Sequence, residues 1–206
     1  MKFLRAGVLV PFLYYGAVLV ASLFYPGYSH GRQYASELGS NSATYPQIFN
    51  TGIILTGVTI LLSLIGFRTA LRGLNARPVL TWLFLVSLAG FGVGMLMGGF
   101  FPMPDPRHGG FGLGVLVHLS PFLLAAALWR DAGTRGLRYF LLANGVAALV
   151  MFAIMMGVGE LVRLSNVGAY QRAYSSTVFP WIGLAAGALV ARFRSPLPAP
   201  GSAPVS

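Results

Sequence analysis

Residues 79–101 read VLTWLFLVSLAGFGVGMLMGGFF and contain no charged side chain. A helix needs about 20 such residues to cross the roughly 30 Å hydrocarbon core of a bilayer, so this run is long enough to span a membrane. Five other runs share its character. The six predicted spans are residues 7–24, 48–67, 79–101, 111–129, 139–158 and 177–193. The sequence therefore predicts an all-α, polytopic membrane protein, a six-transmembrane-helix bundle.

The overall composition agrees with a membrane protein. Only 9% of the 206 residues are charged and 56% are hydrophobic, whereas a soluble fold needs more polar side chains to cover its core. The net charge of +10 does not indicate nucleic-acid binding, because the basic residues stand in short groups at span ends, where they anchor helices. The chain has no cysteine, so we expect no disulfide and no thiolate ligand.

The basic residues alternate between the two sides of the predicted bundle. Ten lie on the side of the N-terminus: Lys2, Arg5, Arg68, Arg72, Arg77, Arg130, Arg135, Arg138, Arg192 and Arg194. Four lie on the other side: Arg32, Arg107, Arg163 and Arg172. The positive-inside rule then places both termini in the cytoplasm. We expect a multi-pass protein of the bacterial cytoplasmic (inner) membrane, with outer connections after the first, third and fifth spans.

Each end of the chain carries its own prediction. Lys2 and Arg5 before an apolar run resemble a secretory signal, but no clean A-x-A site follows and the run is long enough to span. The first span is therefore expected to be retained. Residues 195–206 are rich in Pro, Ala and Ser without an apolar period, which predicts a disordered cytoplasmic tail after a transmembrane domain of residues 1–194.

Glycines four residues apart predict close helix packing. Gly90, Gly94 and Gly98 form such a row in the third span, and Gly183 and Gly187 form another in the sixth. These rows let helix backbones approach each other in lipid, where apolar burial provides no driving force. Packing within one chain and a homodimer face both fit the pattern.

The first outer connection is rich in polar side chains. Residues 25–46 read YPGYSHGRQYASELGSNSATYP. A short helix around residues 32–38, ended by Gly39, would place His30, Gln33, Tyr34 and Glu37 on one face. The sequence leaves open whether this connection covers an outer pocket as a lid.

The other two outer connections add ionisable groups. Asp105, Arg107 and His108 stand close together after the third span. Residues 157–176 read GVGELVRLSNVGAYQRAYSS and include Gln171 and Arg172. All three connections are thus polar in the same way, and we expect them to meet at one outer surface.

His118 lies about two turns inside the predicted fourth span. An ionisable side chain at this depth is costly unless it faces protein or water. It is therefore either a functional residue or a neutral imidazole hydrogen-bonded to Ser87, Ser120 or a backbone carbonyl.

Several short, spaced pieces of the chain resemble one family of bacterial and archaeal membrane proteins. They are SELG at residues 36–39, FN at 49–50, FP at 101–102 with Asp105, His118, and Gly168 followed by QR at 171–172. On these pieces the chain resembles domain of unknown function 998 over nearly its whole length. That family looks related to the Frag/DRAM/Sfk group of six-span proteins, some of whose members are associated with lipid remodelling or distribution. The resemblance implies that the outer polar residues are the ones that matter for function.

Three kinds of function fit these residues. The first is an outer pocket that binds or modifies a membrane lipid or similar amphiphile, with one of the four outer arginines taking an anionic headgroup. The second is a metal-dependent membrane hydrolase, in which His30, His108 and His118 hold zinc with Asp105 or Glu37. Their spacing fits no standard zinc motif. The third is a small-solute or proton-coupled transporter, suggested by His118.

We predict the lipid pocket as the main function, with membrane lipids as partners and no cofactor except zinc in the hydrolase alternative. Its predicted lining residues are Tyr34, Ser36, Glu37, Asn50, Asp105, Arg107, His118, Gln171 and Arg172. In the binding model Arg172 and Arg107 neutralise the headgroup. In the enzymatic model His118, Asp105 and Glu37 are the candidate catalytic residues.

Overall fold

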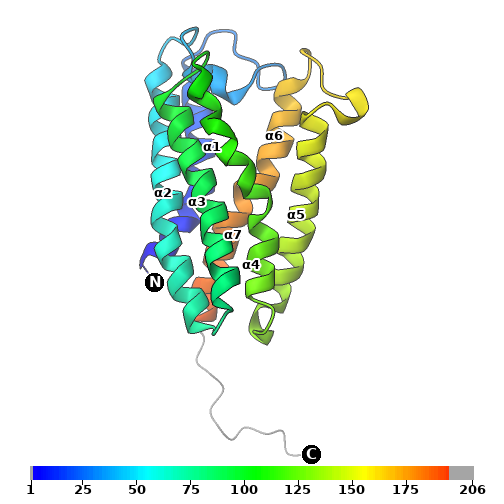
Figure 1. Ribbon diagram of the computed structural model, residues 1–206. Helices are drawn as coiled ribbons and strands as arrows, with labels where there is room; N and C mark the ends of the chain where they lie inside the picture. The colour runs from blue at the N-terminus through cyan, green and yellow to red at the C-terminus, as the bar shows by residue number, and fades with distance from the viewer. Residues whose placement is uncertain (1, 195–206) are drawn as a thin grey trace, which may run out of the picture.

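The computed structural model describes residues 2–194, and every regular element in that range is helical. Six helical stretches are long and apolar enough to cross a membrane, which confirms the predicted all-α bundle (Figure 1). The spans are α1 (Lys2–Leu23), α2 (Pro46–Gly73), α3 (Pro78–Phe100), η2 (Pro106–His118) with α4 (Ser120–Ala127), α5 (Arg135–Met155), and α6 (Val167–Val178) with α7 (Pro180–Arg192). Short 3-10 helices are η1 (Ala35–Gly39), η3 (Ala132–Thr134) and η4 (Val158–Glu160). The predicted tail, residues 195–206, lies outside the described residues.

Proline marks where five of these helices begin. It stands in the first turn of α2, α3, η2, α4 and α7. There its fixed φ suits the helix and its missing N–H costs nothing, because the first turn has no intrahelical acceptor for that group. Pro11 lies inside α1.

The fourth span is broken in its outer half. Gly110, Phe111 and Gly112 all have positive φ, a conformation that glycine adopts without a Cβ penalty. The resulting segment η2 packs on α3, whereas α4 packs on both α5 and α3. A Cβ on Gly94 of α3 would lie 3.1 Å from the backbone nitrogen of Gly114. The glycine row of α3 therefore serves packing within one chain.

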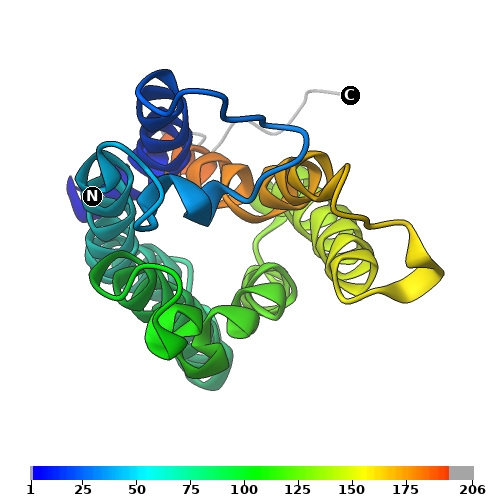
Figure 2. The ribbon, with the colours of Figure 1, turned by 90° about the horizontal axis from the view of Figure 1, so that it is seen from above.

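The helices form a closed ring. Neighbours in sequence pack together, and α6 with α7 completes the ring by packing on α5 and α1 respectively (Figure 2). We call the end with the α2–α3 turn the inner end and the end with η1 the outer end. An ion pair between Arg192 and Asp131, 3.1 Å from nitrogen to oxygen, ties α7 to the connection before α5 at the inner end.

Most of the largest fully buried side chains lie in the inner half of the bundle. Phe67 near the end of α2 and Phe84 near the start of α3 are fully buried, with ring centroids 5.3 Å apart. Leu124, Leu141 and Leu189 are also fully buried there. Such packing orders the helices through many small dispersion contacts.

The largest difference from the predicted spans is at the start of the sixth. It begins at Val167, ten residues before the predicted residue 177. The polar residues of this stretch lower its hydropathy, although they form a regular helix. Gln171 and Arg172 consequently belong to a membrane helix and not to a connection.

Candidate functional site

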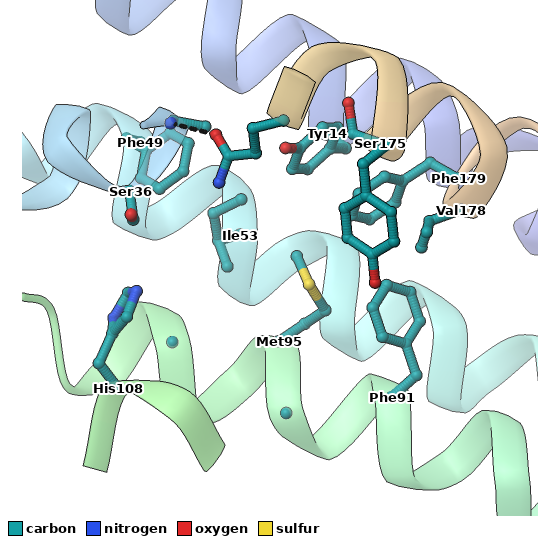
Figure 3. A pocket seen from close by; sticks show the side chains of 15 residues that line it. Tyr14, Ser36, Phe49, Ile53, Phe91, Met95, His108, Ser175, Val178 and Phe179 are labelled. Carbon is teal, nitrogen blue, oxygen red and sulfur yellow. Dashed lines mark hydrogen bonds between the residues drawn. The ribbon is translucent and has the colours of Figure 1, made fainter. Parts of the chain in front are cut away.

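A cavity of about 210 Å³ lies in the outer half of the bundle, beneath η1 (Figure 3). We call it the outer pocket. One water needs only about 10–15 Å³ of such space, so the outer pocket has room for a much larger group. It is lined by Tyr14, Ala35, Ser36, Phe49, Ile53, Phe91, Gly94, Met95, Gly98, His108, Gln171, Tyr174, Ser175, Val178 and Phe179.

Single faces of three helices supply most of the wall. The residues from α3 are Phe91, Gly94, Met95 and Gly98, and those from α6 are Gln171, Tyr174, Ser175 and Val178. Both sets follow the spacing i, i+3, i+4, i+7 of one helix face. Phe49 and Ile53, one turn apart, add the face of α2.

The outer pocket changes character along its length. Ser36 and His108 lie at one end, and Phe91, Phe179 and Val178 lie at the other (Figure 3). At the apolar end Tyr14 stacks on Phe179 with ring centroids 3.6 Å apart. The lining thus carries Ser36 and His108 near the outer surface and is mainly aromatic and aliphatic deeper in the bundle, apart from the hydroxyls of Tyr174 and Ser175.

Gln171 connects the polar end to the first connection. Its Oε1 accepts hydrogen bonds from the backbone N–H of Ala35 and from Nη1 of Arg172, both at 2.7 Å. Its Nε2 donates to no group among the described residues. Because Gln171 lines the outer pocket, this amide is a free donor for a ligand.

Arg172 lies beside Gln171 without a carboxylate partner. The ion pairs of the described residues join other arginines to Asp105 and Asp131. Arg172 donates from Nη2 to the Tyr28 hydroxyl, and its buried Nε has no hydrogen-bond partner. Burial raises the pKa of Tyr28 although the charge of Arg172 opposes the shift, so the phenol stays neutral. The hydrogen-bond partners of Arg172 are thus both neutral.

The first connection is docked on the start of α6. The backbone N–H of Ala169 donates to the carbonyl of Gly31 at 2.9 Å. A Cβ on Gly168 would lie 2.5 Å from the carbonyl oxygen of His30 and 2.6 Å from that of Gln33. Burial, and secondly the charge of Arg172, lowers the pKa of His30. Backbone contact at Gly168 thus holds the connection over the outer pocket.

Three predicted pocket residues support this connection instead of lining the outer pocket. Glu37 accepts from Nε2 of Gln33 at 3.0 Å and from the backbone N–H of Tyr34 at 2.7 Å. Asn50 donates from Nδ2 to the carbonyl of Gly39 at 3.0 Å. The side chains of Glu37, Asn50 and Tyr34 are absent from the lining. Their hydrogen bonds fix the shape of the connection.

Asp105 and Arg107 form an exposed pair outside the lining. The guanidinium donates to both carboxylate oxygens, at 2.9 and 2.7 Å, and covers the ring of Phe101. These side-chain bonds, followed by the backbone N–H of Arg107, lower the pKa of Asp105 to about 2. The neighbouring His108 donates from Nδ1 to the Phe101 carbonyl at 3.0 Å, since a carbonyl can only accept. Only His108 of this group reaches the outer pocket.

His118 lies against the deep part of the pocket wall and is 4% exposed. Its Nδ1 is 2.7 Å from the carbonyl oxygen of Val115 and must carry the proton, because that oxygen only accepts. In the neutral ring Nε2 is then the acceptor, and it receives a hydrogen bond from the hydroxyl of Tyr174 at 2.9 Å. Ser87 and Ser120, the other partners considered for His118, bond to each other at 2.8 Å.

The residues proposed for zinc are not brought together. Among residues 2–194, no group of three His, Asp or Glu side chains could hold a metal ion. His108 and His118 each bind a different backbone carbonyl, and His30 packs edge-on against Tyr28. The donor set therefore does not fit a metal centre.

Several lining residues were not predicted from the sequence, notably Tyr14, Met95, Tyr174 and Ser175. Two of them could have been found from the sequence. Tyr174 and Ser175 are three and four residues after Gln171, and this spacing places all three on one helix face. That signal is visible only once the sixth helix is known to begin at Val167.

Comparison with known proteins gives one match. A family model described as protein of unknown function (DUF998) matches residues 8–188. No curated protein and no solved structure matches the chain. The relation to the Frag/DRAM/Sfk group stays a prediction.

Proposed function

We propose that this chain, which belongs to the DUF998 family, binds a membrane amphiphile in the outer pocket. The observation that carries the proposal is the change from polar to apolar lining between Ser36 and Phe179. A lipid shows the same change, from a polar headgroup to apolar acyl chains. Ligand pockets also combine an apolar wall with a few placed polar groups. We place the protein in a bacterial inner membrane with both termini cytoplasmic, as the arginine distribution indicates.

The polar end favours an anionic headgroup. Nε2 of Gln171 is a free donor, and the hydroxyl of Ser36 is held at 3.1 Å from the Met103 sulfur, a weak acceptor that a better one can replace. Behind Gln171 stands Arg172, which forms no ion pair with a carboxylate among the described residues. A charge solvated only by neutral groups is stabilised by an anion nearby.

The geometry supports binding more than chemistry. A hydrolase needs an activated nucleophile or a metal-bound water beside a base. Asp105 is paired with Arg107, Glu37 is engaged by Gln33 and Tyr34, and the histidines lie apart. The well-packed inner half likewise favours a closed site over a path through the membrane.

A substitution that partly fills the outer pocket tests whether a lipid binds there. Met95→Trp places a larger side chain in the lining, and Val150→Trp on the lipid-facing side of α5, where Val150 is 53% exposed, is the matched control. Displacing two methylene groups of a bound lipid costs about 1.6 kcal/mol, or roughly tenfold in affinity. We expect native mass spectrometry of protein from phosphatidylglycerol nanodiscs to show one lipid fewer on Met95→Trp and no change on Val150→Trp. Equal lipid retention by both variants refutes the proposal.

A second pair of variants tests the headgroup. Arg172→Gln removes the unpaired charge, and Arg163→Gln removes an exposed arginine from the same end of the bundle. We expect only Arg172→Gln to reduce the preference for phosphatidylglycerol over diacylglycerol. If both arginines contribute equally, the preference reflects overall charge and not a headgroup site.

A further inference from the structure

A surface groove lies between α2 and α3 near the inner end, away from the outer pocket. It is a groove of about 230 Å³ lined by Leu64, Ile65, Arg68, Trp82, Leu85, Val86 and Ala89. Its walls are apolar except at Arg68. Ile65, Trp82 and Val86 are half exposed or more, so in a bilayer this groove faces the acyl chains.

The groove continues into a basic hollow at the α2–α3 turn. This hollow, of about 250 Å³, is lined by Arg68, Arg72, Ala76, Pro78, Thr81 and Trp82. Arg68 and Trp82 border both spaces, and the Arg68 guanidinium lies 5.3 Å from the centre of the Trp82 ring. The two spaces together form what we call the inner groove.

The arginines of the inner groove have no acidic partner. The sequences of α2 and α3 contain no Asp or Glu. Among the described residues, Asp131 is the acidic residue at this end of the bundle, and it is paired with Arg192. Arg68 and Arg72 are exposed, so two positive charges face outward at the head of an apolar channel.

The dimensions suit a phospholipid that lies along the helices. From Trp82 to Ala89 the channel follows α3 for about 10 Å, at 1.5 Å per residue. Tryptophan prefers the level of the headgroups, and basic pockets between transmembrane helices bind anionic headgroups. Guanidinium groups bind phosphate with paired, charge-assisted hydrogen bonds.

We propose that the inner groove is a binding site for an anionic phospholipid of the leaflet at the inner end. Arg68 and Arg72 bind the phosphate, Trp82 covers the glycerol region, and one acyl chain lies between Ile65 and Val86. This site is separate from the outer pocket and does not depend on the proposed function.

The test measures how strongly brominated lipids quench the fluorescence of Trp82. Protein in vesicles of brominated phosphatidylglycerol is compared with protein in brominated phosphatidylcholine, since bromine quenches a tryptophan that it touches. The difference between the wild type and Trp82→Phe isolates the signal of Trp82. We expect Trp82 to be quenched more by the anionic lipid, and the combined variant Arg68→Gln/Arg72→Gln to lose this preference. One arginine near an anionic surface contributes about fivefold in affinity.

The matched control removes the same charge from the same end. Arg130 and Arg135 are exposed and lie outside the inner groove. Arg130→Gln/Arg135→Gln should leave the preference at Trp82 intact. An equal loss with this control, or no preference in the wild type, overturns the proposal.

Two further measurements keep the two lipid sites distinguishable. Compared with Met95→Trp/Trp82→Phe, the variant Met95→Trp should leave the quenching of Trp82 unchanged, because Met95 lines the outer pocket and not the inner groove. A thermal melt of each arginine variant verifies that it remains folded. Loss of lipid at one site with retention at the other therefore assigns success or failure to each proposal separately.

Discussion

His118 shows how neighbours define the role of a single residue. As a lone histidine in a membrane span it suggested a metal ligand or a proton carrier. The structure gives both ring nitrogens a partner, with Nδ1 donating to Val115 and Nε2 accepting from Tyr174. The ring thereby orients the hydroxyl of a pocket-lining tyrosine. His118 is a positioning residue in the proposed site.

A double-mutant cycle tests this interaction. His118→Phe and Tyr174→Phe each remove one partner at similar volume, so their effects on the free energy of unfolding should not add. We expect a coupling of about 0.6 kcal/mol, typical of hydrogen bonds between membrane helices. Tyr170→Phe, on the same helix without a hydrogen bond to His118, should be additive with His118→Phe. Additive effects for the first pair contradict the assigned hydrogen bond.

At the scale of elements, α6 decides whether the outer pocket exists. Its polar residues lie all around the helix, and one face supplies Gln171, Tyr174 and Ser175 to the lining. Its first turn also carries the first connection through Gly168 and Ala169. One short helix thus forms both a wall of the outer pocket and the support of its cover.

Gly168→Ala should release that cover. The added methyl group meets the backbone of His30 and Gln33, which cannot rotate away as a side chain can. Overpacking of this kind costs about 1–3 kcal/mol. We expect faster hydrogen exchange in residues 25–45 and little change in α2 or α3. Gly187→Ala, in the same span with no atom within 4 Å of the added Cβ, should be neutral or slightly stabilising. Similar exchange in both variants would show that the connection does not rest on Gly168.

At the scale of the whole molecule, packing is divided between two halves. The inner half is filled by Phe67, Phe84 and the leucines around them. The outer half holds the outer pocket and most of the polar connections. Large buried side chains thus fill the centre of the bundle in the inner half, whereas the outer half leaves a ligand-sized space between its helices.

The orientation of the whole bundle is open to a direct test. The chain has no cysteine, so a single introduced cysteine reports one position. Ser165→Cys lies in the exposed connection before α6, and Ala132→Cys lies in the exposed connection before α5. With both termini cytoplasmic, a membrane-impermeant maleimide should label Ser165→Cys in intact cells and Ala132→Cys only after permeabilisation. The reverse pattern would invert the predicted topology.

The sequence by itself determined the number of spans and the class of fold. Hydrophobicity over about 20 residues is a local property, and the bilayer imposes helices on any apolar run that crosses it. The same local averaging misplaced the start of the sixth span, because residues 170–176 are polar except Ala173 and lower its mean hydropathy.

Only the tertiary structure decided which polar residues share the outer pocket. Ser36, His108 and Gln171 line it, whereas Glu37 and Asn50 fix the connection above it and Asp105 pairs with Arg107 outside it. All are polar residues of the outer end, and residue type alone does not show which of them line the outer pocket. The separation depends on which side chain finds a partner nearby, and that is a property of distances between helices that are far apart in the sequence.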